Sequence, residues 1–261
     1  MKPSRILLIA LLSVAALSAQ PLSKEYIRLG DRLLAIEMIA RPGVEDPVFA
    51  GGWNMLNSGA GTSGWHVFAA ADFDGNGVPD LLWQNTSTGQ VNVNYYGGPG
   101  GAILTGFAVL NNGSGTSGWA AVAAADFDGN GVPDLIWQNQ STGQVNVNYY
   151  GGSGGATLIG YAVLNNGSGT SGWRVVAAAD FDGNGVPDLI WQNTSTGQVN
   201  ANYYGGSGGA TMIGWSILNS GACTGGWSVV ATADFDDNGV QDLIWQNHST
   251  GQVNVNYYIR P

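Results

Sequence analysis

The sequence predicts an all-β protein: a β-propeller of four near-identical four-stranded blades, closed by an N-terminal strand. Three observations lead to this fold. A segment of 54 residues is written four times, each copy contains four short β-prone runs, and the two ends of the array complement each other. A repeat period of about 50 residues is typical of propeller blades and of other repeat arrays.

A nine-residue segment marks each copy of the repeat. Asp72, Asp126, Asp180 and Asp234 each begin a DFD[GD]NGV[PQ]D segment, and successive segments start 54 residues apart. The repeats span residues 53–106, 107–160, 161–214 and 215–261, and the second and third differ at six of 54 positions. Sequences this similar should form the same supersecondary unit four times.

Each repeat has the pattern of strands. WRVVAAADF and PDLIWQN are short β-prone runs, VNVNYY alternates apolar and polar residues, and ATLIGYAVLNN follows a glycine-rich turn. No stretch within the repeats combines helical periodicity with caps. Four strands per repeat match the number in a propeller blade.

The ends of the array predict how the ring closes. The last repeat lacks the ATLIGYAVLNN strand, and a segment of roughly residues 48–57 precedes the first repeat, where WNMLN aligns with YAVLN. If this segment completes the last blade, no blade is left with an open edge. The alternative is an incomplete ring that closes only by oligomerising.

The residues before the repeats fall into two segments. Lys2 and Arg5 precede an apolar run that ends in small residues, which is the order of a secretory signal peptide over residues 1–19. Residues 20–46 form a linker or collar of unknown role, and residues 47–261 form the propeller. We expect a secreted or extracellular protein, with the periplasm or cell surface as alternatives, and no membrane span in the mature chain.

Charge and composition exclude several classes of function. The chain has 18 acidic and 8 basic residues, a net charge of −10, which argues against a nucleic-acid partner. A single cysteine excludes an intrachain disulfide framework. The two histidines, His66 and His248, stand at different places in the repeat, and no nucleophile is paired with a base. We therefore expect a protein that is not an enzyme.

The aspartates of each marker segment have the spacing of metal ligands. Positions 1, 3, 5 and 9 offer side-chain oxygens, position 6 is a glycine that permits a sharp turn, and position 7 offers its carbonyl. The predicted ligands of the four loops are Asp72, Asp74, Asn76, Val78 and Asp80; Asp126, Asp128, Asn130, Val132 and Asp134; Asp180, Asp182, Asn184, Val186 and Asp188; and Asp234, Asp236, Asn238, Val240 and Asp242.

An all-oxygen ligand set suits a hard cation, Ca²⁺ before Mg²⁺, because calcium tolerates irregular geometry. We expect about four Ca²⁺ ions, one per repeat, bound with modest affinity because an asparagine at position 5 lowers the ligand charge. The competing explanation is that Asp-Gly and Asn-Gly merely form turns. Three carboxylates within nine positions would repel one another without a cation. From Pro47 onward the chain has thirteen acids and two bases, and twelve of those acids are the predicted ligands.

Units such as GWRVVAAADFDGNGVPDLIWQNTSTGQV resemble the FG-GAP/VCBS repeats of bacterial secreted proteins, which are related to the propeller blades of integrin α subunits. The resemblance covers roughly residues 48–261 and rests on the calcium loop with its flanking tryptophans. It implies a calcium-bound β-propeller used for adhesion, for ligand or sugar recognition, or as an accessory module.

The function that we expect is a binding or adhesion module for a glycan or a cell-surface protein, multivalent because its blades are nearly identical. The alternative is a structural or accessory domain without a ligand of its own, and a polysaccharide-active enzyme is the least favoured reading. Two interpretations of the recurring tryptophans stay open: sugar-stacking platforms or blade-to-blade core. They are Trp65, Trp119, Trp173 and Trp227, with Trp83, Trp137, Trp191 and Trp245. The asparagines of VNVNYY suit a hydroxyl-rich ligand or a solvated strand.

Overall fold

The computed structural model describes residues 25–29, 32–37, 55–59, 61–221 and 225–260. The chain divides into two units, Met1–Asn54 and Met55–Pro261. In the first unit, β1 (Glu25–Leu29) pairs antiparallel with β2 (Arg32–Glu37). The segment predicted as a linker or collar thus contains a two-stranded hairpin, whereas the predicted signal peptide, residues 1–19, lies outside the described residues.

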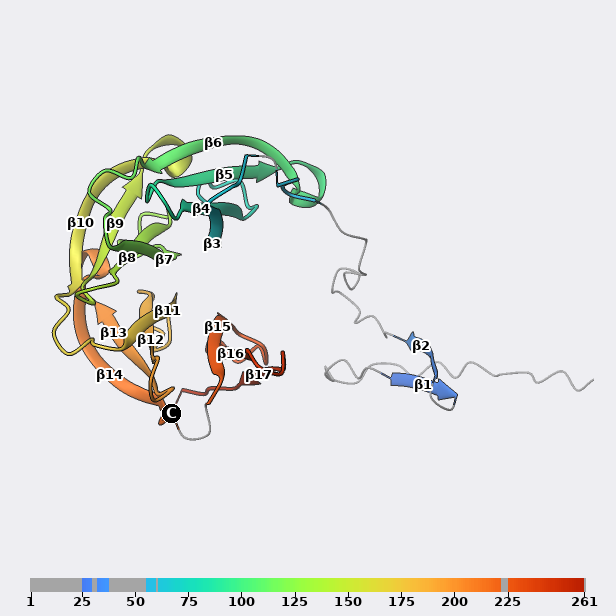
Figure 1. The fold of residues 1–261 in the computed structure, drawn as a ribbon. Coiled ribbons are helices and arrows are strands. Elements are labelled where there is room, and N and C mark those ends of the chain that lie inside the picture. Colours follow the sequence, from blue (N-terminus) through green and yellow to red (C-terminus); the bar gives the residue numbers. More distant parts are fainter. Residues whose placement is uncertain (1–24, 30–31, 38–54, 60, 222–224, 261) are drawn as a thin grey trace, which may run out of the picture. The chain divides into compact units, whose positions relative to one another are not determined.

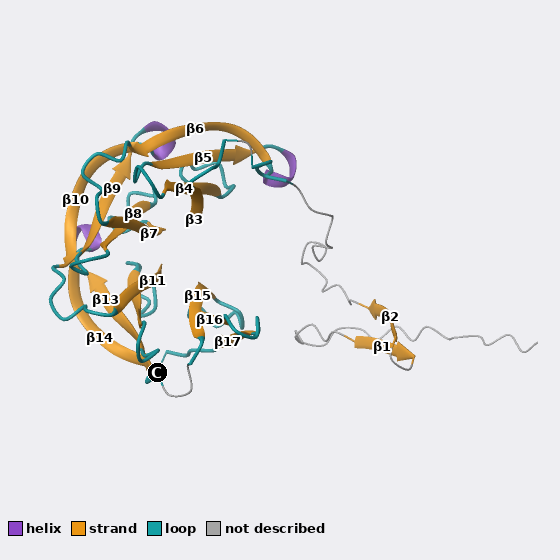
Figure 2. Cartoon of the chain, viewed as in Figure 1, coloured by secondary structure: helices purple, strands orange, loops and turns teal. Residues whose placement is uncertain are grey.

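The second unit consists of four antiparallel sheets, arranged as the blades of a four-blade β-propeller (Figures 1 and 2). The strands are β3 (Trp65–Ala71), β4 (Asp80–Asn85), β5 (Val91–Gly97) and β6 (Ile103–Asn111); β7 (Trp119–Ala125), β8 (Asp134–Asn139), β9 (Val145–Gly151) and β10 (Thr157–Asn165); β11 (Trp173–Ala179), β12 (Asp188–Asn193), β13 (Val199–Gly205) and β14 (Thr211–Asn219); and β15 (Trp227–Ala233), β16 (Asp242–Asn247) and β17 (Val253–Asn256). The 3-10 helices η1 (Pro99–Gly101), η2 (Ser153–Gly155) and η3 (Ser207–Gly209) are each one turn long. The prediction of an all-β propeller is confirmed.

Within each sheet, strands that follow one another in sequence are neighbours, as expected of antiparallel hairpins. The first strands of successive sheets lie next to one another, and the fourth strands lie on the outside (Figure 1). A bulge interrupts the first strand at the same place in every sheet, between Val67 and Ala69 in β3 and between Val175 and Ala177 in β11. Such a bulge leaves a backbone group outside the regular ladder, available to a neighbour.

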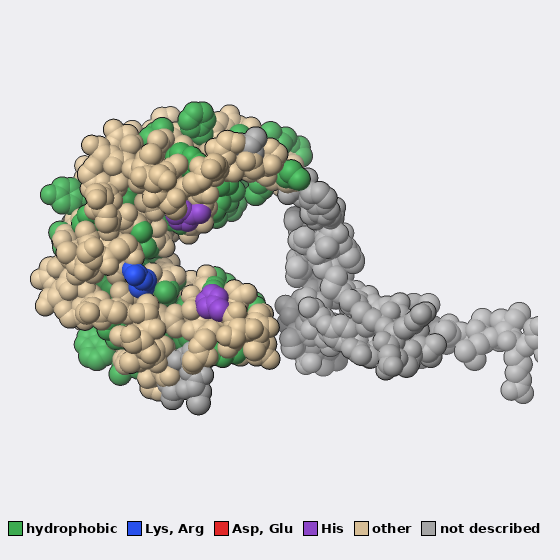
Figure 3. Space-filling model, viewed as in Figure 1, with side chains coloured by type: hydrophobic (Ala, Val, Ile, Leu, Met, Phe, Trp, Pro, Cys, Tyr) green, Lys and Arg blue, Asp and Glu red, His purple; other side chains and the backbone are tan. Residues whose placement is uncertain are grey.

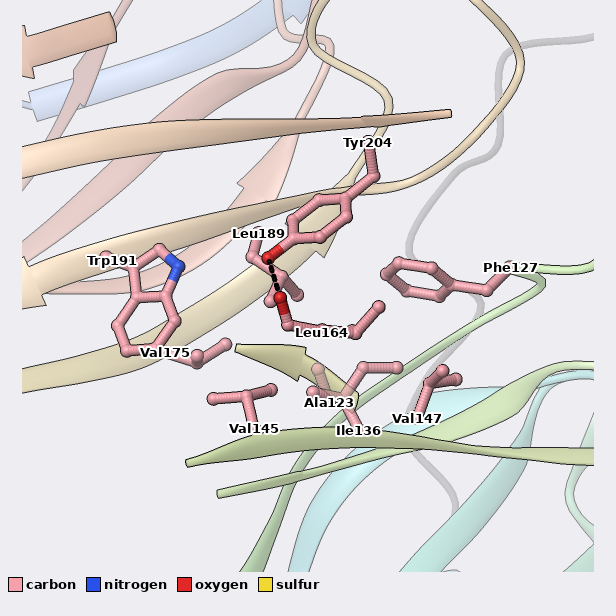
Figure 4. Packing of buried hydrophobic residues seen from close by; sticks show 10 residues of the cluster. All are labelled: Ala123, Phe127, Ile136, Val145, Val147, Leu164, Val175, Leu189, Trp191 and Tyr204. Carbon is pink, nitrogen blue, oxygen red and sulfur yellow. Dashed lines mark hydrogen bonds between the residues drawn. The ribbon is translucent and has the colours of Figure 1, made fainter. Parts of the chain in front are cut away.

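The hydrophobic core lies between the sheets. Between the second and third sheets, Ile136, Val145 and Val147 of one sheet pack against Leu189 and Trp191 of the next (Figure 4). Clusters of equivalent residues lie between the first and second sheets and between the third and fourth. The second and third sheets are therefore buried on two faces, which explains why DLIWQN is apolar at consecutive positions rather than at alternate ones.

A glutamine near the end of the second strand links neighbouring sheets in the first three blades. The amide of Gln138, which is 1% exposed, donates to the carbonyl of Trp173 (3.1 Å) and accepts from the N–H of Val175 (3.1 Å), beside the bulge of β11. Gln192 makes the same pair of bonds to Trp227 and Val229. These amides satisfy backbone groups of a first strand that has no neighbouring strand on its other side, so they fix the spacing of the blades.

The fourth sheet has three strands among the described residues, because β17 has no outer neighbour there. The strand predicted to close the ring, roughly residues 48–57, lies mostly outside the described residues. Its described part, from Met55 to Asn57, is not a strand, but the carbonyl of Leu56 accepts a hydrogen bond from the Tyr96 hydroxyl (3.2 Å). The equivalent hydroxyl of Tyr150 donates to Leu110 at the end of an outer strand.

Replacing the inter-blade glutamine should destabilise the protein. Gln138→Ala leaves the N–H of Val175 and the carbonyl of Trp173 buried without a partner, so the free energy of unfolding should fall by about 2–3 kcal/mol. The matched control is Gln246→Ala, because no described residue bonds the side chain of this fourth copy. Its free energy of unfolding should change by no more than about 0.5 kcal/mol. Urea unfolding at low protein concentration measures both, and equal losses would rule out the linking role.

Candidate metal centres and inter-blade pockets

The four predicted metal loops connect the first and second strands of each sheet. In the first repeat the loop begins after β3, at Asp72, and ends at Asp80, the first residue of β4. Gly75 and Gly77 have φ of 74° and 83°, which the chain needs in order to turn back on itself. In the fourth loop Asp237 replaces the first glycine and takes φ of 60°, a conformation that aspartate tolerates better than most residues.

Each loop brings its three aspartates together. One carboxylate oxygen from each lies within 4.8 Å of the others in all four loops. The groups are Asp72, Asp74 and Asp80; Asp126, Asp128 and Asp134; Asp180, Asp182 and Asp188; and Asp234, Asp236 and Asp242. Twelve of the predicted ligands thus gather in four groups, one per repeat, each able to hold a metal ion.

The ninth residue of each loop is buried and holds the loop to the sheet. The carboxylate of Asp134 has no exposed surface, and it accepts hydrogen bonds from the N–H groups of Phe127 (2.9 Å) and Tyr150 (2.8 Å). Asp80, Asp188 and Asp242 repeat both bonds. This aspartate therefore ties the start of the loop to the third strand.

The other polar residues of the loop fold its backbone. Asp126 accepts from the N–H groups of Gly129 (2.8 Å) and Gly131 (2.8 Å). The amide of Asn130 accepts from the N–H of Val132 (2.7 Å) and donates to the carbonyl of Tyr150 (2.8 Å). Equivalent bonds form in the other three loops at the asparagine and valine positions. Coordination by these asparagine and valine oxygens stays a prediction.

Burial makes the ninth aspartate of the first three loops difficult to ionise. It raises the pKa of Asp134 to about 7 and that of Asp188 to about 6, and it raises the pKa of Asp80 as well. The backbone N–H donors oppose this effect, and the neighbouring carboxylates add to it. A bound cation would favour the charged form. No ion pair with Lys or Arg neutralises these aspartates within the described part of the chain. The donor chemistry therefore fits a metal ion.

Pockets recur between neighbouring sheets. A pocket of about 210 Å³ lies between the first and second sheets, and one of about 290 Å³ lies between the second and third. They share eight equivalent lining positions: Asn111, Ser114, Gly115, Thr116, Trp119, Trp137, Asn146 and Asn148 in the first, and Asn165, Ser168, Gly169, Thr170, Trp173, Trp191, Asn200 and Asn202 in the second. The larger pocket also has Met212 and Trp215 in its wall.

Burial separates the two sets of tryptophans. Trp137 and Trp191 are 4% and 3% exposed and belong to the core clusters, so their rings pack between blades and are not open stacking platforms. Their indole N–H groups are buried without a hydrogen-bond partner. Trp119 and Trp173 are only partly buried and stand at the pocket walls beside the asparagines.

Polar grooves lie beside these pockets. One groove, next to the first sheet, is bordered by His66, Ala120 and Gln140. The groove that follows it is bordered by Gln140 and Arg174. Figure 3 shows the face on which histidine and arginine side chains are visible and no acidic side chain is. This agrees with the topology, because His66 lies near the start of β3 and the aspartate loop follows its other end.

The sequence did not identify the loop after each outer strand as part of a pocket. The residues from Asn111 to Thr116 form that loop, and Gly113 sits so close to Thr88 that a side chain there would collide with its carbonyl oxygen, 2.2 Å from the Cβ position. The recurring Asn-x-x-Ser-Gly-Thr order of the second and third repeats was the available signal.

Comparison with known families agrees with this architecture. Residues 72–137 and 126–191 each match the family model of the FG-GAP-like repeat. Each match runs from the start of one aspartate loop to the second-strand tryptophan of the next repeat. No curated protein and no solved structure matched the chain. Among the described residues there is no helix with the length and apolar character needed to cross a membrane.

Without metal, the protein should lose stability as the pH rises from about 4 to 7. The buried aspartates have folded-state pKa values above the unfolded value of 3.8, so the folded state binds more protons in this window, and stability falls as they ionise. Thermal unfolding in a chelator at pH 4, 5.5 and 7 measures the effect. The double variant Asp134→Asn, Asp188→Asn should flatten the profile, and an unchanged profile would contradict the assignment.

Proposed function

Because the chain carries FG-GAP-like repeats, we propose that it is a calcium-binding β-propeller that works as a binding module. The observation that carries the proposal is the recurrence of one pocket, lined by equivalent tryptophan and asparagine residues, between consecutive blades. A repeated pocket on a rigid scaffold is the arrangement of a multivalent receptor. The module binds and does not catalyse.

Calcium is the metal that best suits the four loops. The predicted ligands are all oxygen atoms, which hard cations prefer, and the irregular loop favours Ca²⁺ over Mg²⁺, which demands near-octahedral geometry. The buried Asp134 and Asp188 would be held ionised by the ion, offsetting the cost of their burial. Affinity on the order of 10⁻⁴–10⁻³ M, as in extracellular modules, is expected.

The ligand class follows from the lining of the pocket. Asn146 and Asn148, with Ser114 and Thr116, provide hydrogen-bond donors and acceptors, and Trp119 provides a partly buried aromatic surface. Amides and hydroxyls beside an aromatic ring suit the hydroxyl groups and apolar faces of a sugar. We infer that the ligand is a glycan, presented at a cell surface to a protein exported by its signal peptide.

A scaffold without a ligand is the second candidate. The burial of Trp137 and Trp191 favours it, since these rings stabilise the contact between blades and are not free to stack on a ligand. In this role the propeller would position another domain or partner. Binding measurements separate the two candidates.

Calcium should stabilise the protein. If the dissociation constant is about 1 mM, 10 mM Ca²⁺ contributes about 1.4 kcal/mol per site, and four sites should raise the melting temperature by at least about 10 °C. Scanning calorimetry with Ca²⁺ and with a chelator measures the difference, and Mg²⁺ at the same concentration is the control. No response to Ca²⁺ or to the chelator would exclude the calcium loops.

Glycan binding should depend on the pocket asparagines. A glycan array in millimolar Ca²⁺ identifies the ligand, and the double variant Asn146→Ala, Asn200→Ala should then bind it about ten-fold more weakly because hydrogen bonds are lost. Gln140→Ala, in the polar grooves outside these pockets, is the matched control. Absence of binding to any glycan on the array favours the scaffold. Loss of binding only in the Gln140 variant would indicate that the glycan binds in the grooves.

A further inference from the structure

Two faces of the propeller lack the neighbour that every other blade face has. Every later sheet packs onto the sheet before it through one face, here called the leading face, and the first sheet leaves this face uncovered. The fourth sheet presents the opposite face, here called the trailing face. The leading face consists of Val67, Leu81 and Trp83, and the trailing face of Phe235, Ile244, Val253 and Val255.

Burial shows that the trailing face is incomplete. Val253 is 59% exposed, whereas the valines at the same place in the three other sheets, Val91, Val145 and Val199, have no exposed surface. Phe235 is 56% exposed, whereas its three counterparts are 1–6% exposed and form edge-to-face contacts with a tyrosine of the next sheet. The same side chains that form the core elsewhere are thus left in water.

The leading face has the matching deficit. Val67 is 43% exposed, whereas Ala121, Val175 and Val229 at the same position are 4–5% exposed. Leu81 is partly exposed, whereas its counterparts Leu135, Leu189 and Leu243 are fully buried. Both differences lie on the side of the first sheet that has no preceding sheet.

The hydrogen-bonding groups of an inter-blade contact are also divided between the fourth sheet and the first. Gln246 is the fourth copy of the inter-blade glutamine, and none of the described residues bonds its side chain, whereas Gln84, Gln138 and Gln192 each bond the next sheet. The groups that would receive such a glutamine are those of β3, at the bulge beside Val67. One half of a complete interface therefore lies on the fourth sheet, and the other half lies on the first.

We propose that the trailing face of one chain packs against the leading face of a second copy of this chain, head to tail. The three internal interfaces define the contact: Val253 meets the partner's Val67 and Trp83, and Gln246 bonds the partner's bulged strand. The internal interfaces are built from nearly identical residues, so a further step of the same kind places a fifth blade beyond the fourth.

A second copy is the occupant because it satisfies both faces at once. Two chains packed head to tail in a closed ring bury two trailing and two leading faces, and a heterologous contact forms such a ring when its rotation closes. Within the single chain, Val253, Phe235 and Val67 remain exposed, so the first sheet does not already serve as the cover. None of the seven residues of the two faces is charged, and nothing on them opposes the contact electrostatically.

The two faces can be tested separately. Val253→Asp and Val67→Asp each place a charge at the contact, and because both valines are exposed in the single chain, the variants should keep the melting temperature of the dilute protein. Sedimentation equilibrium of the full chain in Ca²⁺ should show a dimer for the unaltered protein. Each variant should dissociate at least about 100-fold more readily, because an unpaired charge is costly to bury. Val163→Asp, at an outer-strand valine 46% exposed, is the matched control and should leave the dimer intact.

Mixing the variants tests the polarity of the contact. Val253→Asp retains a good leading face and Val67→Asp a good trailing face, so an equimolar mixture should recover association through one intact interface, whereas each variant alone should not. A monomeric unaltered protein would overturn the proposal. If Val253→Asp also destabilised that monomer, the ring would close within the single chain. A dimer that resists both variants would also overturn it.

Discussion

Each repeat depends on one buried carboxylate. Asp134 and its three counterparts accept the N–H of the phenylalanine that starts the loop and the N–H of a tyrosine in the third strand. The bond positions the two other aspartates of the loop, and it places Phe127 where its ring meets Tyr204 of the next blade, with centroids 6.2 Å apart. Loop, sheet and interface are thus set by one side chain. Burial raises the pKa of Asp134, and a bound cation would favour its charged form.

The second constraint is that the blades are almost copies of one another. Because one interface is written several times, its features recur together: the buried tryptophan, the glutamine at the bulge, and the pocket beside the outer loop. Repetition also leaves a leading face and a trailing face at the ends of the array. The same similarity that would make a binding module multivalent makes these two faces complementary.

Local sequence was sufficient for much of this architecture. The strands follow from β-prone runs between glycine turns, and the gathering of Asp126, Asp128 and Asp134 follows from their spacing in one tight loop. The role of Gln138 could not be predicted, because its partners belong to another blade, 35 and 37 residues away. The tryptophans stayed ambiguous for a related reason: a strand pattern says which residues share a face, but not which faces meet. The proposed closing strand lies mostly beyond the described residues.

We propose that the acidity of the repeats consists of four metal sites. Equilibrium dialysis against radioactive Ca²⁺ tests it most directly, because it counts ions and does not depend on any change in stability. We expect saturation in the millimolar range at about four ions per chain, falling by one when Asp126 and Asp128 are both replaced by asparagine. Absence of saturable binding, or a count that this variant leaves unchanged, would contradict it.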